Sequence, residues 1–449
     1  MYQGKSVLVV GAAKSGIAAA RFLAQQGAKV TITDHKRGEA LLGAKQQLAA
    51  WPISWEEGGN NPKTAQDADF VVVSPGVPRE NAALTAAKGA GRPVLGEVEL
   101  AYQNLQGPMV AITGSNGKST TTMLVGEMLQ RSNKKTFIGG NIGTPLIEAA
   151  LQPFDAIVAE ISSFQMEWVS GFQPKVAAIL NLSPNHLDRH SSLEEYRDLK
   201  LKLLSQVAAD GVAIWNASDP VLAEHCPKVT MGKRQLTFSL AYQDGVSAWV
   251  SDGSFQLQFE GRLEQYPVSA VRLRGKHNHE NILAALLLAR HMGATPEGIR
   301  AALSSFAGLA HRLESVGVID GVEYVNDSKA TSVAATVCAL EAFPEETKLI
   351  LLAGGKDKGG SYAPLAPLAA SRCKAVLVFG EAKHLLAAAL SSSVQVVLVE
   401  DITQAVQRAK ELATPGDVVL LAPACSSYDQ FPNFEVRGDT FRDAVRALS

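Results

Sequence analysis

Residues 109–120, MVAITGSNGKST, combine an apolar run with glycines, a lysine and hydroxyl side chains. Glycines let several backbone N–H groups converge on phosphate oxygens, and the start of a following helix adds positive charge. Lys118 would supply a point charge to the outer phosphates, and the hydroxyl of Ser119 suits Mg²⁺. The usual phosphate loop has a glycine where Ile112 stands, so this loop has the shorter form G-x-x-G-K-S. The alternative is an ordinary strand-to-helix turn. The predicted triphosphate loop comprises Gly114, Ser115, Asn116, Gly117, Lys118, Ser119 and Thr120.

Two further polar residues follow apolar runs of the same region. Glu160 ends the run 156–159, and His186 lies shortly after the run 176–181. In open parallel sheets, ligands bind beyond the carboxyl ends of the strands. Taken singly, Glu160 could be a solvated acid at the end of a strand, and His186 could be a loop residue that only forms hydrogen bonds. Their shared position near Lys118 predicts that both hold Mg²⁺ beside the bound phosphates.

The amino-terminal residues 7–16, VLVVGAAKSG, read as a strand, a glycine turn and a helix start. A dinucleotide fingerprint would be G-x-G-x-x-G, and Ala13 replaces its middle glycine. A β-carbon there argues against NAD. The helix amides could still hold a diphosphate with Asp34 near a ribose, and simple helix–strand packing remains the alternative.

Three loops of the last third also follow strand-like runs. They are residues 326–332 (NDSKATS), 354–360 (GGKDKGG) and 423–431 (PACSSYDQF), and the pair His311-Arg312 precedes them. Any one of these loops, taken alone, would be explained as part of a charged surface. Together they predict an edge rich in cations suited to phosphate and carboxylate.

Short β-rich runs alternate with Ala/Leu-rich helical stretches almost throughout, which is typical of α/β proteins with parallel sheets. We predict three domains, 1–97, 98–308 and 309–449. The exception to the pattern is 211–273, where residues 249–257 alternate around an Asp-Gly pair, a hairpin signal. We expect 211–273 to form a small antiparallel addition to the central domain.

The 449 residues are 46% hydrophobic and 19% charged with a net charge of −2, so no basic excess favours nucleic acid. The four cysteines, Cys226, Cys338, Cys373 and Cys425, lie far apart and predict reduced, buried thiols. Neither a signal peptide nor a run of 18 apolar residues is visible. These features predict a cytoplasmic protein without a membrane span.

At these motifs the chain resembles the Mur ligase family over essentially its whole length. The family motifs are residues 114–122, 139–143 and 186–190 together with His277-Asn278, while 160–165 and 426–438 resemble the D-glutamate-adding members. The resemblance implies a Rossmann-like UDP-binding domain, a central P-loop ATPase-like domain and a Rossmann-like carboxyl-terminal domain that binds the amino acid.

The resemblance also implies a reaction. D-Glutamate would be joined to UDP-N-acetylmuramoyl-L-alanine in cytoplasmic peptidoglycan precursor synthesis, with ATP going to ADP and phosphate. Phosphorylation would turn the inert carboxylate into an acyl phosphate, which the amine attacks through a tetrahedral intermediate. The expected cofactors are ATP and two Mg²⁺ ions, and the expected state is a monomer.

By the same resemblance, Lys118, Glu160, His186, Lys200 and Lys329 are the expected catalytic residues. Lys200 matches a lysine that the family carbamylates to make an anion near a second magnesium, although by itself it reads as a helix-surface lysine. The metal ligands would be Ser119, Glu160, His186 and the Lys200 carbamate.

The resemblance also assigns residues to each of the three substrates. ATP would meet Asn278, Asn281, Arg312 and Asp327, in addition to the phosphate loop. The UDP substrate would meet Ser15, Asp34, His35, Lys36, Ser74, Gly76 and Asn141. D-Glutamate would meet Thr331, Lys358, Ser427 and Phe434.

Three other functions fit the sequence less well. A folate-elongating sister ligase disagrees with the tail 427–438 and with the diphosphate-type first domain. A nucleotide-binding switch would not need the added amino-acid domain, and Ala13 disfavours a dehydrogenase.

Overall fold

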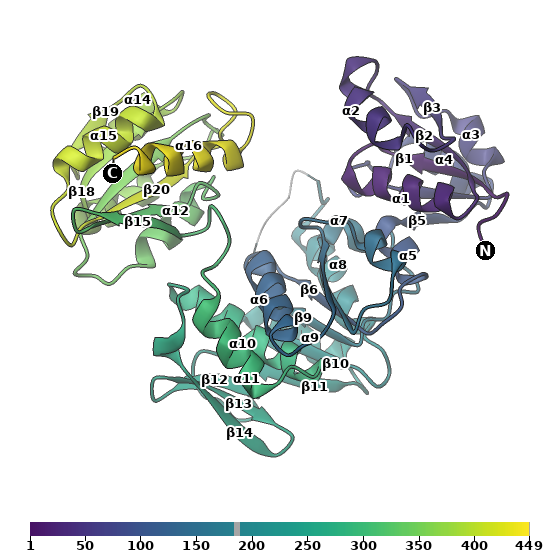
Figure 1. The fold of residues 1–449 in the computed structure, drawn as a ribbon, viewed down its shortest axis with the longest axis horizontal. Helices are drawn as coiled ribbons and strands as arrows, with labels where there is room; N and C mark the ends of the chain where they lie inside the picture. The colour runs from purple at the N-terminus through teal and green to yellow at the C-terminus, as the bar shows by residue number, and fades with distance from the viewer. Residues whose placement is uncertain (184–188, 449) are drawn as a thin grey trace. The chain divides into compact units, whose positions relative to one another are not determined.

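The computed structural model describes residues 1–183 and 189–448. Helices and strands alternate along the chain and build three separate sheets, as the α/β prediction requires (Figure 1). The chain divides into two compact units, one made of Met1–Val271 with His279–Ser305 and the other of Arg272–Asn278 with Phe306–Ser449.

The amino-terminal sheet is parallel and has the order β3-β2-β1-β4-β5. Its strands are β1 (Ser6–Val10), β2 (Lys29–Asp34), β3 (Ser54–Glu57), β4 (Phe70–Val73) and β5 (Val94–Gly96). Its helices are α1 (Lys14–Gln25), α2 (Glu39–Leu48), α3 (Pro62–Asp67), α4 (Ala82–Gly89) and α5 (Glu97–Tyr102). The strand order reverses between β1 and β4, and in such sheets ligands bind beyond the carboxyl ends at this point.

The central sheet has nine strands in the order β14-β13-β12-β11-β10-β9-β6-β8-β7. They are β6 (Met109–Thr113), β7 (Thr136–Gly140), β8 (Ala156–Glu160), β9 (Val176–Ile179), β10 (Val212–Asn216), β11 (Arg234–Phe238), β12 (Ala248–Ser251), β13 (Ser254–Phe259) and β14 (Arg262–Pro267). Every residue of β6, β8 and β9 is buried. Continuous apolar runs of this kind suit parallel strands that are covered on both faces.

The helices of this region are α6 (Lys118–Gln130), α7 (Ser163–Met166), α8 (Leu193–Ser205), α9 (Pro220–Val229), α10 (Lys276–His291) and α11 (Pro296–Ser305), with the 3₁₀ turns η1 (Leu146–Leu151) and η2 (Val268–Ala270). Within the described ranges, no helix combines the length and apolarity needed to cross a bilayer.

The prediction that residues 211–273 form an antiparallel addition is wrong for its first part. Strands β10 and β11 pair in parallel, because α9 lies between them in the chain and returns it to the same end of the sheet. Antiparallel pairing begins only at β12 and β13. There the expected hairpin is confirmed, with positive φ at both Asp252 and Gly253 of the turn.

The carboxyl-terminal sheet has the order β15-β16-β20-β17-β18-β19. Its strands are β15 (Glu314–Ile319), β16 (Val322–Asn326), β17 (Leu349–Gly354), β18 (Cys373–Phe379), β19 (Val396–Leu398) and β20 (Val418–Ala424). Its helices are α12 (Val333–Glu341), α13 (Ala366–Arg372), α14 (Lys383–Leu390), α15 (Ile402–Leu412) and α16 (Phe434–Arg446), with the 3₁₀ turn η3 (Ala363–Leu365). The purely parallel expectation is wrong at one edge, since β15 pairs antiparallel with β16.

The expectation for the thiols is also wrong at one position. All four cysteines are free, and Cys226, Cys373 and Cys425 are buried, but Cys338 is exposed. Cys338 lies on α12, whose inward face is formed by Thr336, Ala339 and Leu340. Helical periodicity therefore turns Cys338 outward.

Candidate active site

The phosphate loop lies between β6 and α6. Gly114 and Gly117 have φ values of 149° and 80°, a region that favours glycine. A β-carbon at Gly117 would also lie 2.1 Å from Oδ1 of Asn281, so a side chain at this position would displace the Asn281 amide. Helix α6 begins without a side-chain cap and without an acidic residue in its first turn. Its amino end is therefore suited to an anion.

Polar contacts hold this loop against the segment that follows β9. Asn181 accepts a hydrogen bond from the backbone N–H of Asn116 at 2.8 Å, and its amide donates to the Asn116 carbonyl at 3.3 Å. The hydroxyl of Ser115 donates to the Ser183 carbonyl at 2.9 Å and lies 3.0 Å from the Tyr196 hydroxyl. The loop is thus ordered by side chains from two neighbouring elements.

Two lysines converge on one carbonyl of this loop. Lys118 Nζ donates to the carbonyl oxygens of Gly114 at 2.9 Å and Ser115 at 3.0 Å. Lys200, from α8, donates to the same Gly114 carbonyl at 2.8 Å and to Thr113 Oγ1 at 3.3 Å. The expectation that Lys200 taken alone would lie on the surface does not hold, because it is only 2% exposed.

Burial lowers the pKa of Lys200 well below its ordinary range. The neighbouring positive charge of Lys118 lowers this pKa further, while Glu160 acts in the opposite direction. A buried amine in this position loses its proton more readily than a surface lysine does.

Glu160 ends β8, next to β6, and is almost fully buried. Its Oε1 accepts a hydrogen bond from Asn141 Nδ2 at 2.7 Å. Its Oε2 is buried without a hydrogen-bond partner in the described part of the chain. A buried carboxylate oxygen of this kind fits a hard cation such as Mg²⁺, which takes one or two carboxylates and completes its shell with water and phosphate.

The structure therefore brings Lys118, Ser119, Glu160 and Lys200 together around the carboxyl ends of β6 and β8. His186 lies outside the described residues. Within the described ranges, no group of three or more His, Cys, Asp or Glu side chains could hold a metal. Since Mg²⁺ binding with phosphates needs few protein ligands, the acid Glu160 and the Ser119 hydroxyl remain a fitting donor set.

The amino-terminal sheet has a comparable edge at β1 and β4. Gly11 has a φ of 96°, and a β-carbon there would lie 2.9 Å from the Ser74 β-carbon. Ser74 Oγ donates to the Gly11 carbonyl at 2.9 Å. Asp34, at the end of β2, accepts from the backbone N–H groups of Ala12 at 2.7 Å and Lys36 at 2.9 Å.

These contacts shape the turn that precedes α1, whose first turn has neither a side-chain cap nor an acidic residue. Ser15 lies in this first turn, whereas Gly76, His35 and Lys36 are exposed on loops. Ser15, Asp34 and Ser74 thus gather at the strand-order reversal. The arrangement suits a diphosphate at the amino end of the helix.

The expected residues of the carboxyl-terminal sheet gather at the ends of β16, β17 and β20, which run parallel. Lys358 Nζ donates to the Thr331 carbonyl at 2.8 Å, and Lys329 Nζ lies 4.7 Å from the centre of the Phe434 ring. Ser427, after β20, is 3% exposed.

Asp327 and Arg312 lie in the same unit. Burial raises the pKa of Asp327 to about 7, and Arg312 opposes this shift.

Arg437 is a residue whose role sequence reasoning missed, although it lies within the 426–438 motif. Its buried guanidinium donates to the carbonyls of Ser328, Cys425 and Ser426 at 2.9 to 3.2 Å. Those loops follow β16 and β20, so Arg437 fixes their spacing. Its position three residues into a helix gave no indication that the side chain points into the fold.

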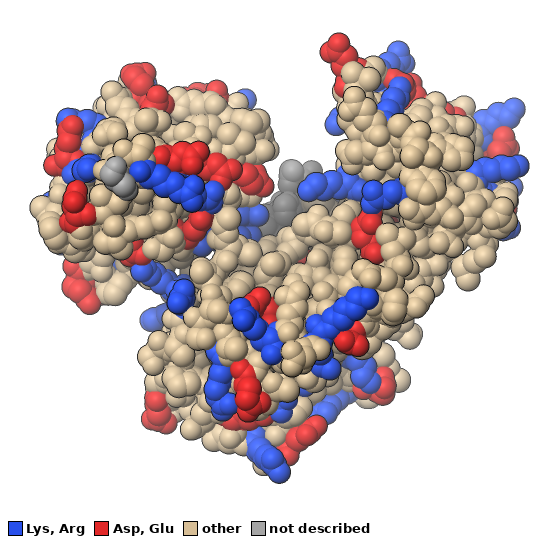
Figure 2. Space-filling model, viewed as in Figure 1, with Lys and Arg blue, Asp and Glu red and all other residues tan. Residues whose placement is uncertain are grey.

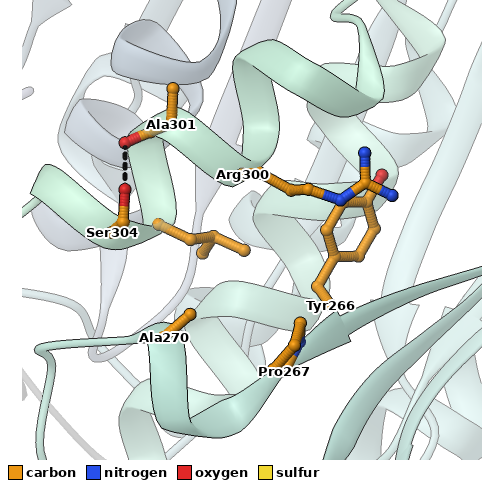
Figure 3. Close-up of a pocket in the computed structure, with 7 residues that line it drawn as sticks. Tyr266, Pro267, Ala270, Arg300, Ala301 and Ser304 are labelled. Atoms are coloured by element: carbon orange, nitrogen blue, oxygen red, sulfur yellow. Dashed lines mark hydrogen bonds between the residues drawn. The ribbon is translucent and has the colours of Figure 1, made fainter.

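A hollow elsewhere in the central region has a different character. Between the end of β14, η2 and α11 it is lined by Tyr266, Pro267, Ala270, Arg300, Ala301, Leu303 and Ser304 (Figure 3). The Arg300 guanidinium lies 5.5 Å from the Tyr266 ring centre, and Ser304 Oγ donates to the Ala301 carbonyl at 3.0 Å. The lining is mainly apolar and contains none of the residues expected to bind substrate or nucleotide.

Surface charge is mixed rather than one-signed. On the face drawn in Figure 2, acidic and basic side chains lie interspersed among uncharged residues. This distribution accords with the net charge of −2.

A phosphate loop that follows a parallel strand of the central sheet, in a chain with two further α/β sheets with polar edges, defines a multidomain nucleotide-binding protein. Comparisons with known proteins identify the family within this class. Family models match residues 5–96 (Mur ligase MurD-like, N-terminal domain), 112–289 (Mur ligase middle domain) and 311–425 (Mur ligase, glutamate ligase domain). The chain belongs to the Mur ligase family.

Similar proteins include two named UDP-N-acetylmuramoylalanine–D-glutamate ligase. That of Geobacter metallireducens is 43% identical over 447 residues, 99% of this chain and 98% of the relative. That of Anaeromyxobacter dehalogenans is 46% identical over 452 residues, 98% and 97% of the two chains. Among solved structures, the UDP-N-acetylmuramate-alanine ligase of Thermotoga maritima has a TM-score of 0.61 at 18% identity, covering 99% of this chain and all of that one.

These matches confirm the family and the fold class inferred from the motifs. The family-model matches fall within the predicted domains 1–97, 98–308 and 309–449, whose limits stay predictions. ATP and Mg²⁺ follow from membership of this ATP-dependent family.

Proposed function

We propose that this protein joins D-glutamate to UDP-N-acetylmuramoyl-L-alanine, with ATP converted to ADP and phosphate. The observation that carries the proposal is the cluster of Lys118, Lys200 and Glu160 at one sheet edge, where Glu160 Oε2 has no hydrogen-bond partner among the described residues. The names of the relatives, which match over nearly the whole chain, indicate the two substrates.

In the first step, an oxygen of the substrate carboxylate attacks the γ-phosphorus of ATP, and the bond between that phosphorus and the bridging oxygen of ADP breaks. Phosphoryl transfer of this kind requires positioning and neutralisation of charge. Lys118 and the amino end of α6 would supply positive charge to the transferring group. Glu160 and Ser119 would hold Mg²⁺, which neutralises phosphate charge when bound.

In the second step, the amine of D-glutamate attacks the acyl carbon and a tetrahedral intermediate forms. The bond between this carbon and the phosphate oxygen then breaks, phosphate leaves, and the nitrogen loses a proton. We assign Thr331, Lys358, Ser427 and Phe434 to D-glutamate and Lys329 to the reacting phosphate. Asn141, whose amide already binds Glu160, would contact the acyl substrate.

We further propose that Lys200 carries a carbamate. Its neutral amine would attack CO₂, forming an N–C bond and releasing one proton, and the product is an anion beside a second Mg²⁺. Support comes from the burial of Lys200 and its lowered pKa, because only the unprotonated amine reacts.

The remaining assignments follow the same proposal. Asn278, Asn281, Arg312 and Asp327 are assigned to ATP, His186 to the metal, and Ser15, Asp34, His35, Lys36, Ser74 and Gly76 to the UDP moiety. A monomer in the cytoplasm is the expected state.

The test is phosphate release from ATP with UDP-N-acetylmuramoyl-L-alanine, measured with and without D-glutamate. We expect sustained release only when D-glutamate is present. Release that ignores D-glutamate, or that requires a folate substrate, would contradict the proposal, and absence of any turnover would favour a nucleotide-binding switch.

A further inference from the structure

Tyr362 reaches from the core of the carboxyl-terminal domain into the loop that follows β17. The residue is 7% exposed and belongs to the apolar cluster beneath the sheet. Its hydroxyl donates to Oδ1 of Asp357 at 2.6 Å and lies 3.2 Å from Sγ of Cys425. This hydroxyl links the loop after β17 to the loop after β20, which are also joined by backbone hydrogen bonds between Lys356 and Ser426 at 2.9 and 3.2 Å.

Asp357 is held on both of its carboxylate oxygens. Oδ1 accepts from Tyr362, and Oδ2 accepts from the backbone N–H of Gly359 at 3.1 Å. Lys358 lies between Asp357 and Gly359 in the sequence, but its ammonium donates to the Thr331 carbonyl at 2.8 Å. In the described part of the chain, no ion pair joins Asp357 to Lys358, although they are adjacent and opposite in charge.

Asp357 is an anion at neutral pH, as an aspartate ordinarily is, and the hydrogen bond from Tyr362 lowers its pKa further. Without its tyrosine partner, this anion would have a free oxygen one residue along the chain from the lysine that carries the ammonium. A carboxylate and an ammonium within reach of one another pair readily. Such a pair would compete with any carboxylate that Lys358 has to bind from solution.

We propose that Tyr362 is a positioning residue that keeps Asp357 from pairing with Lys358, so that the ammonium remains available to a carboxylate of the amino-acid substrate. The proposal rests on the function proposed above and adds a determinant of amino-acid affinity to it. It makes Tyr362 important through its hydroxyl rather than through its ring.

The first test is Tyr362→Phe in the full-length chain, assayed by phosphate release with D-glutamate varied and the other substrates saturating. We expect the KM for D-glutamate to rise about fivefold, the scale of an exposed ion pair that competes for the ammonium, while kcat and the KM for ATP stay within about twofold. Tyr324→Phe is the matched control, since Tyr324 is a buried tyrosine on the other side of the same sheet.

The decisive test is the double variant Tyr362→Phe/Asp357→Asn. An asparagine can still accept from Gly359 but cannot neutralise Lys358, so we expect the KM for D-glutamate to return toward the wild-type value. If the hydrogen bond between Tyr362 and Asp357 only stabilised the loop, the double variant would have a KM for D-glutamate at least as high as that of the single variant. A KM unchanged in Tyr362→Phe, or a double variant no better than the single one, would overturn the proposal.

A measurement without turnover separates this proposal from the proposed function. Lys358 is exposed, so its reaction with an amine-acylating reagent can be followed by mass spectrometry. Pairing with Asp357 raises the pKa of Lys358 and slows acylation, so we expect slower labelling in Tyr362→Phe than in wild type. Equal labelling would overturn the positioning role, whereas failure of D-glutamate-dependent turnover in the wild type would overturn the proposed function.

Discussion

Glu97, the first residue of α5, is a buried acid in the unit that contains Met1–Val271. Its Oε1 accepts from the backbone N–H of Ile147 at 2.7 Å, while Oε2 is buried without a hydrogen-bond partner in the described ranges. Burial raises the pKa of Glu97 from 4.5 to about 7; the bond from Ile147 opposes this shift, and nearby Glu148 adds to it. The folded protein therefore keeps a proton that the unfolded chain releases, and stability falls as pH rises from about 4.5 to about 7.

The size of the effect follows from the two pKa values. At about 1.4 kcal/mol per unit, the raised pKa lowers the unfolding free energy by about 1 kcal/mol at pH 5 and by about 3 kcal/mol at pH 8. Glu97→Gln keeps an oxygen that can accept from Ile147 and cannot ionise. The variant should therefore gain about 2 kcal/mol relative to wild type between pH 5 and pH 8. Effects of the amide that do not depend on pH cancel in this comparison.

Urea unfolding followed by tryptophan fluorescence is the appropriate assay. All five tryptophans lie in the unit that contains Glu97, at positions 51, 55, 168, 215 and 249, so the signal reports that unit alone. Glu39→Gln, a change at an exposed acid of the same unit, is the control and should show little dependence on pH. A Glu97→Gln difference equal at pH 5 and pH 8, or larger at pH 5, would refute the reasoning.

The remaining predictions concern the central site. Lys118→Ala should lower kcat at least about a hundredfold without changing the urea midpoint, because a charge on the transferring phosphoryl group is lost; a near-normal rate would contradict the loop assignment. Lys200→Ala should be inactive and partly rescued by added acetate, and full activity without acetate would remove Lys200 from the mechanism. Gly117→Ala should weaken binding of an ATP analogue at least about tenfold in calorimetry, given the 2.1 Å approach to Asn281, whereas Gly43→Ala, with open space around it, should not.

The features that sequence analysis predicted well are those encoded locally. The apolar run of β6, the glycines with positive φ and the uncapped start of α6 all lie within residues 109–120, so pattern and structure coincide there. The hairpin around Asp252-Gly253 was predictable for the same reason. Each depends on the backbone preferences of a few adjacent residues.

Features that depend on distant partners were not predicted. The parallel pairing of β10 with β11 depends on the crossover through α9. The antiparallel strand β15 depends on its pairing with β16. The burial of Lys200 and of Arg437 likewise depends on loops far away in sequence. A lysine or arginine in a helix carries no local mark of whether it points outward.

The two lysines at the Gly114 carbonyl show how such a distant contact changes chemistry. Lys118 and Lys200 both donate to this oxygen, at 2.9 and 2.8 Å, so two ammonium groups would repel each other across it. Release of a proton from the more buried Lys200 relieves that repulsion. Conversion of the neutral amine to a carbamate would go further, since an anion beside Lys118 replaces repulsion by attraction. The fold thus favours the neutral amine at this buried nitrogen, which is the form that the proposed carbamylation requires.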